Sequence, residues 1–185
     1  MKRNLILAFG LLTLLTIVNT SCKKLKNAAK INIELSYANI DFTIPTITAA
    51  GPATLMAKDV YLNVDSLIKA NNGALSAGNI KSVTVKSCVI TMIDGDANNN
   101  FSALQSAKAD FKSNVNSNWY TIAEITNNPD VEDYEIEIPV NSSINLKDYF
   151  NATTFSYTIY GEARKATTHP IQCKATIKYN LEAGL

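Results

Sequence analysis

Apolar and polar residues alternate with a period of two through most of the chain after residue 30. Such alternation is typical of β-strands that bury one face, because successive side chains of a strand point to opposite sides. The clearest case lies near the C-terminus, where one face carries Ile171, Cys173, Ala175, Ile177 and Tyr179 and the other carries Gln172, Lys174, Thr176 and Lys178. Residues 170–181 are therefore predicted to form a half-buried strand.

The same pattern predicts further strands at 30–44, 58–64, 79–93, 118–126, 133–140 and 154–166. Within 79–93 the apolar positions change parity near Lys86 and Ser87, which predicts either a β-bulge or a strand buried on both faces. The polar segment 165–170, with the sequence KATTHP, separates the last two strands. A connection this short predicts that they form an antiparallel hairpin.

Helical signals are few and short. Residues 64–73 offer Asp65 or Ser66 as a helix N-cap and end at Asn72–Gly73, a pair that stops helices. Residues 100–107 and 144–150 are each long enough for one or two turns. About eight short strands separated by turns predict an all-β protein: a two-layer antiparallel β-sandwich, Ig-like or of Greek-key type, with one to three short helices. One-sided alternation disfavours a parallel α/β sheet, whose strands are apolar on both faces.

The N-terminus has the pattern of an export signal. Lys2 and Arg3 precede an apolar run over residues 5–18, and at roughly fourteen residues this run is shorter than the roughly twenty that span a bilayer. The small residues that follow lead to Cys22, and the stretch resembles the lipobox of bacterial lipoproteins, although Asn19 stands where Leu is usual. The resemblance implies cleavage before Cys22 and acylation of that residue. The alternative is an ordinary secretory signal followed by an unrelated cysteine.

This interpretation divides the chain into a signal peptide (1–21), a basic tether (22–30) and one β-sandwich domain (31–185). The whole chain of 185 residues has a formal net charge of +1, but residues 31–185 carry 11 basic and 16 acidic side chains. The lysines of the tether would attract an anionic membrane surface, or they would only keep a spacer soluble. A domain with excess negative charge has no footprint for nucleic acid, so we expect no such partner.

The succession of segments 64–73, 78–92, 100–107 and 144–150 resembles a group of small, uncharacterised β-sandwich lipoproteins of Gram-negative outer membranes. The resemblance covers residues 40–182 and implies the fold and the lipid anchor, and it brings no catalytic residues. No acidic run follows Cys22. We therefore expect a protein that is anchored in the outer membrane and faces the periplasm.

One polar stretch, residues 94–101, invites a metal interpretation. Asp94, Asp96, Asn98 and Asn100 alternate as the oxygen ligands of calcium loops do. However, Asn99 and Gln105 stand where such a loop needs Gly and Glu. A turn that leaves a strand explains the same residues, so we expect no bound metal here.

The remaining candidates for chemistry are scattered along the chain. Cys88 and Cys173 fall on apolar faces, which allows either a disulfide in an exported protein or two buried thiols. The lone His169 is expected in an exposed turn. The pair Glu135 and Glu137 is expected on the solvated face of a strand. The adjacent aromatics at 119–120 are expected to pack in the core rather than to bind sugar.

The sequence contains no phosphate loop, no Cys-x-x-Cys pair and no cofactor fingerprint. We therefore expect no cofactor and no enzymatic activity. The favoured function is a lipid-anchored binding or structural accessory domain that docks with another envelope protein or with a small ligand. Two alternatives stay open: a carbohydrate- or calcium-dependent binding module, and a hydrolase whose site follows no recognisable motif.

Overall fold

The computed structural model describes residues 31–185, except for the side chains of 36–38, so the predicted signal peptide, Cys22 and the tether lie outside the described residues. The described part forms eight strands: β1 (Ile31–Ile44), β2 (Gly51–Tyr61), β3 (Ile80–Met92), β4 (Ala107–Ser113), β5 (Tyr120–Ile125), β6 (Glu135–Glu137), β7 (Thr154–Ala163) and β8 (Ile171–Ala183). One α-helix, α2 (Val64–Asn71), and three short 3₁₀ turns, η1 (Ala77–Asn79), η2 (Phe101–Ala103) and η3 (Lys147–Tyr149), lie between them. The predicted all-β class with a few short helices is confirmed.

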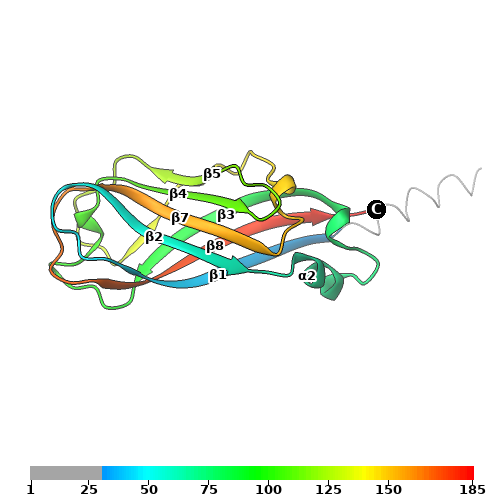
Figure 1. The fold of residues 1–185 in the computed structure, drawn as a ribbon, viewed down its shortest axis with the longest axis horizontal. Coiled ribbons are helices and arrows are strands. Elements are labelled where there is room, and N and C mark those ends of the chain that lie inside the picture. Colours follow the sequence, from blue (N-terminus) through cyan, green and yellow to red (C-terminus); the bar gives the residue numbers. More distant parts are fainter. Residues whose placement is uncertain (1–30) are drawn as a thin grey trace, which may run out of the picture.

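The strands form two antiparallel sheets of four, which lie along each other as the two layers of an elongated sandwich (Figure 1). Sheet A has the order β1-β8-β3-β6 and sheet B the order β2-β7-β4-β5. This is the order of a jelly roll, in which two Greek keys wrap around one core. The predicted β-sandwich of Greek-key type is thus confirmed, whereas the strand order differs from that of the immunoglobulin fold.

The predicted C-terminal hairpin is wrong. β7 lies in sheet B between β2 and β4, and β8 lies in sheet A between β1 and β3. The connection crosses between the layers because Thr167 is tied to the first loop: the Ile47 amide donates to Thr167 Oγ1 at 2.9 Å, and the Thr167 amide donates to the Ile47 carbonyl at 2.9 Å. These bonds hold the connection where it passes from β7 in sheet B to β8 in sheet A. Among the described strands, only β4 and β5 are consecutive in sequence and also paired.

The predicted parity change in β3 is confirmed as an irregularity of the ladder. The pairing of β3 with β8 shifts between Val85 and Ser87, so that Val85 and Cys88 both face the core. A similar shift in β1 lies between Tyr37 and Asn39. In both strands an extra residue restores the apolar face to the inside of the sandwich.

Other boundaries differ from the predictions. β2 begins at Gly51 rather than near Lys58, and β4 was not predicted at all. The helix is capped by Asn63, whose Oδ1 accepts from the Ser66 amide at 2.9 Å, and not by Asp65 or Ser66. The Asp65 carboxylate instead accepts from the Ala77 amide at 2.9 Å, which ties the helix to η1.

An aromatic cluster fills the centre of the core. Phe150 lies 5.0 Å from Tyr179 and 5.2 Å from Phe155, centroid to centroid, and Phe111 lies 6.0 Å from Tyr157. The two tyrosine hydroxyls are 3.2 Å apart and so partner each other inside the core. Because these rings come from both sheets, the cluster fixes how the two layers face each other.

Polar contacts lie along both edges of the sandwich. The side-chain amide of Asn145 pairs with the backbone of β3 in the way that a neighbouring strand would. It accepts from the Val83 amide at 3.0 Å and donates to the Lys81 carbonyl at 3.2 Å. On the opposite side, Lys58 donates from the edge of β2 to the Asp41 carbonyl of β1 at 2.5 Å. An inward-pointing lysine at an edge disfavours the addition of a further strand. No helix within residues 31–185 has the length and apolar character needed to cross a bilayer.

Candidate functional site

The solvent-facing side of sheet B gathers residues from all four of its strands. We call this surface the outer face, and its members alternate with the core residues of each strand. It comprises Thr54, Ala57, Asp59 and Tyr61 of β2, Ser156, Thr158, Tyr160 and Glu162 of β7, Lys108, Asp110 and Lys112 of β4, Thr121 and Glu124 of β5, and Trp119 just before β5.

Three exposed aromatic side chains lie on the outer face. Trp119 is 48% exposed, Tyr160 36% and Tyr61 73%. Tyr and Trp, whose rings carry one polar group, are enriched at binding surfaces. The expectation that Trp119 packs in the core is wrong: its neighbour Tyr120 turns inward, with its ring 6.4 Å from that of Tyr149, and Trp119 therefore faces out.

Charged side chains of β4 run between these rings. The Lys112 ammonium lies 4.7 Å from the centroid of the Trp119 ring, in cation–π contact. The Tyr160 hydroxyl donates to Asp110 Oδ2 at 2.7 Å, and this bond is the main reason that the pKa of Tyr160 lies above its ordinary value. The other carboxylate oxygen, Asp110 Oδ1, is buried and has no hydrogen-bond partner among the described residues.

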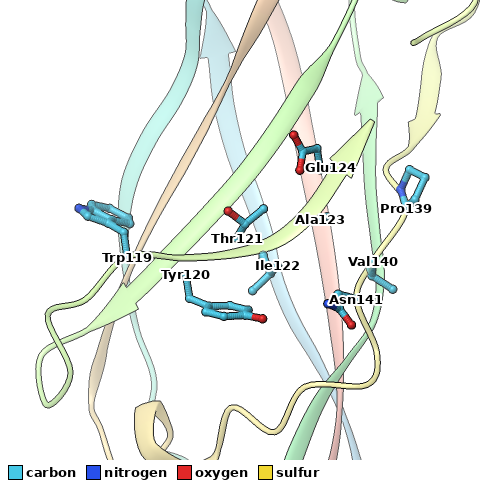
Figure 2. A pocket seen from close by; sticks show the side chains of 9 residues that line it. All are labelled: Trp119, Tyr120, Thr121, Ile122, Ala123, Glu124, Pro139, Val140 and Asn141. Carbon is cyan, nitrogen blue, oxygen red and sulfur yellow. The ribbon is translucent and has the colours of Figure 1, made fainter. Parts of the chain in front are cut away.

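Two hollows adjoin the outer face and share Glu124. The first has a volume of about 540 Å³ and lies where β5 meets the segment 139–141. Figure 2 shows Trp119, Thr121 and Glu124 projecting from one side of β5, while Tyr120 and Ile122 project from the other. The second, of about 380 Å³, lies over β2, β4 and β7 and is lined by Pro52, Ala53, Thr54, Ser106, Lys108, Glu124, Tyr160, Gly161 and Glu162.

The opposite face of the sandwich has a different character. The outward positions of β8 carry Gln172, Lys174, Thr176, Lys178, Asn180 and Glu182, and those of β3 and β6 are likewise without an aromatic ring among the described residues. Glu135 and Glu137 lie on this face, as predicted, and are exposed. The two sheets therefore present one polar face and one face that mixes polar groups with rings.

The predicted turn at 94–101 is confirmed, and its oxygens are directed at protein partners. Asp96 accepts from the Asn98 amide at 2.7 Å and from the Asn99 side chain at 2.8 Å, and Asp94 accepts from the Gln172 amide at 2.6 Å. Asn100 donates to the backbone carbonyl of Asp96 at 3.1 Å. Within residues 31–185, no group of three or more His, Cys, Asp or Glu side chains lies close enough to hold a metal ion.

The central residue of this turn is one that the sequence did not single out. Asn99 is fully buried, and it accepts from the Thr168 amide at 2.7 Å across 69 positions of sequence. His169 lies beside it in the predicted loop and is half-buried, with Nε2 3.1 Å from Asp96 Oδ2 and Nδ1 2.8 Å from the Pro170 carbonyl. These bonds, that to Pro170 first and that to Asp96 second, raise the pKa of His169.

Cys88 and Cys173 are both buried in the core and both carry free thiols. They lie on adjacent strands, but Cys88 is opposite Ile177 and Cys173 is opposite Met92, four positions further along. At about 3.3 Å per residue this places them roughly 13 Å apart along the strands, whereas a disulfide needs Cα atoms within about 7 Å. The possible bridge is therefore not supported by this geometry. Burial raises the pKa of each thiol to about 12.

Comparison with known proteins assigns the chain to no family. No protein-family model and no curated protein matches the chain. Among solved structures, infectious bursal disease virus strain Gx is 9% identical over 84% of this chain and 32% of its own, with a TM-score of 0.39. Carbohydrate-binding modules from the β-sandwich superfamily are 9% identical over 80% and 52%, with a TM-score of 0.35. The chain thus spans about a third of the viral protein, and likenesses this weak carry no argument about function.

Proposed function

We propose that this protein is a non-catalytic binding domain, held at the bacterial cell envelope by a lipid on Cys22, that binds its ligand with the outer face of sheet B. The observation that carries the proposal is the gathering of Trp119, Tyr160 and Tyr61 on one sheet face. The stable strands beneath hold these side chains in place, as a preformed binding surface requires.

The reactive side chains of the described residues support a binding role over a catalytic one. Cys88 and Cys173 are buried thiols of raised pKa, so the thiolate form that a nucleophile needs is scarce at neutral pH. His169 has one ring nitrogen against a backbone carbonyl and the other against Asp96. An imidazole held in this way ties two loops together and is already engaged at both nitrogens.

The anchor is the part of the proposal that rests on residues 1–30. A cysteine behind a short apolar signal receives two or three acyl chains in a lipoprotein, and two chains suffice for a stable hold on a membrane. The basic tether then spaces the domain from the bilayer. We place the protein in the outer membrane facing the periplasm, where its partner is an envelope component.

The anchor is tested with the variant Cys22→Ser in cells that are fed labelled palmitate. We expect the wild-type chain to carry the label and to sediment with membranes, and the variant to lose both properties because no thiol is available for acylation. The variant Cys88→Ala serves as the matched control, since it removes a buried thiol and leaves Cys22 in place. Undiminished label and membrane retention in Cys22→Ser would reject the anchor.

A further inference from the structure

We propose that the outer face of sheet B binds a neutral saccharide chain. The inference rests on the proposed function and adds the class of ligand. Four observations support it: exposed rings, interspersed charges of both signs, a high density of hydrogen-bonding groups and the distance between the rings.

The rings offer the stacking surfaces that a saccharide needs. The face of an aromatic ring carries negative partial charge, which attracts the weakly positive C–H groups on the flat side of a sugar ring. Trp119 and Tyr160 present such faces on the two sides of β4, and each already attracts a cation: Lys112 lies 4.7 Å and Lys108 5.9 Å from the respective ring centroid. Each ring thus already attracts a positively charged group, the kind of attraction that the C–H groups of a sugar would also experience.

Charges of both signs are interspersed on the outer face. Lys108 and Lys112 lie among Asp59, Asp110, Glu124 and Glu162, so that acidic groups are in excess. An anionic ligand would meet four carboxylates, and a cationic one would meet two ammonium groups. A neutral polyhydroxylated chain can donate to the carboxylates and accept from the ammonium groups at the same time.

Hydrogen-bonding groups cover the surface between the rings. Asp110 is opposite Thr158 on one side and Thr121 on the other, so that two hydroxyl-bearing residues neighbour it across the strands. Asp110 Oδ1 lacks a partner among the described residues, and an unmet buried acceptor lowers stability by about 1–3 kcal/mol. A ligand hydroxyl that reached this oxygen after a shift of nearby side chains would satisfy it.

The separation of the rings sets the size of the ligand. Lys112, which contacts Trp119, and Lys108, which pairs with Tyr160, lie four residues apart on β4. Trp119 and Tyr160 flank β4 on its two sides, so they lie roughly 13 Å apart along the strands and about 10 Å apart across them. A ligand that contacts both rings must be longer than one sugar ring, which indicates an oligosaccharide or polysaccharide.

A protein partner fits this surface less well. The centre of a protein–protein interface is depleted in charged residues, whereas β4 places Lys108, Asp110 and Lys112 at the centre of the outer face. Docking a protein here would remove all three charges from water. Their mutual pairing would offset the resulting desolvation free energy only in part. A saccharide leaves such groups hydrated or hydrogen-bonded.

The test is native affinity electrophoresis of the full chain, purified in detergent, through gels that contain neutral polysaccharides. The probes are starch, dextran, xylan, mannan, laminarin and hydroxyethyl cellulose, with heparin as an anionic comparison. We expect at least one neutral polysaccharide to retard the protein. Trp119→Ala should weaken that binding about tenfold or more, because it removes the most exposed stacking face of the two hollows. Asp110→Ala should weaken it as well.

Tyr134→Ala is the matched control, because Tyr134 is 37% exposed, much like Tyr160, but adjoins β6 in sheet A. It should bind as the wild type does. Absence of retardation by every neutral probe, retardation by heparin alone, or unchanged binding of Trp119→Ala would overturn the saccharide assignment. Capture of an envelope protein that depends on Trp119, without saccharide binding, would also overturn it and would leave the proposed binding function standing. Loss of the anchor in the palmitate experiment would not affect it.

Discussion

At the scale of single residues, His169 and Asp96 join two loops that lie 73 positions apart in sequence. Both ring nitrogens of His169 face oxygen acceptors, an arrangement that favours the doubly protonated imidazolium and raises the pKa of His169 above its ordinary 6.5, with a contribution from nearby Asp94. Bonds from the Asn98 amide first, and then from His169, lower the pKa of Asp96 below 3.8. Both groups are therefore mostly charged between about pH 3.8 and 6.5.

The stability of the protein should depend on pH through this pair. A raised histidine pKa stabilises the fold below about pH 6.5 and ceases to do so as the pH rises through the folded-state value. A lowered aspartate pKa stabilises above about pH 3.8 and ceases as the pH falls through the folded-state value. We expect His169→Ala to lower the melting temperature most between pH 4 and 6 and much less at pH 9. A loss of equal size at all pH values would show that packing, and not charge, is responsible.

The sequence predicted whether a residue lies in a loop or a turn, but it did not predict which distant residue it contacts. His169 is in an exposed loop, as Pro170 indicated, and residues 94–101 form a turn, as their Asp and Asn content indicated. That Asn99 would be buried against Thr168 could not be predicted, because no local pattern specifies a contact across 69 positions. Trp119 was misplaced for a related reason: alternation alone does not say which parity of β5 faces the core.

At the scale of elements, strong alternation predicted strands well and weak alternation did not. The buried side of β8 is made of large residues, whereas β4 buries Ala107 and Ala109 beside Phe111, and alanine is a weak signal of burial. β2 was found only in part because its register shifts between Thr54 and Met56, which breaks the pattern. Both omissions concern strands that build the outer face, so most of the candidate site could not be predicted from the sequence.

Gly161 marks a point where β7 lies close to the start of β4. A Cβ atom there would be 2.0 Å from the Ser106 carbonyl oxygen and 3.0 Å from Ala107 Cα, and both are backbone atoms that cannot move aside cheaply. We expect Gly161→Ala to lower the free energy of unfolding by about 1–3 kcal/mol or more, measured by urea denaturation. Gly73→Ala is the control, because nothing lies within 4 Å of its added Cβ. Equal midpoints for the two variants would contradict the close approach.

At the scale of the whole molecule, the predicted sandwich is correct and the predicted path through it is not. Alternation reports that a strand buries one face, but it carries no information about which strand lies beside it. The chain changes sheet at every connection except the one between β4 and β5, so sequence neighbours are poor guides to pairing. The outer face exists only because this topology brings Lys108 of β4 beside Tyr160 of β7.

The most direct test of the central claim asks which face of the sandwich contacts a ligand in the cell. A photo-reactive benzophenone amino acid is incorporated in place of Thr121 on the outer face, or in place of Thr84 on the outward side of sheet A; both threonines are half-buried in strands. After illumination of intact cells, we expect a slower-migrating adduct from the Thr121 position and none from the Thr84 position. Adducts of equal yield from both positions, or an adduct from Thr84 alone or from neither, would contradict the account.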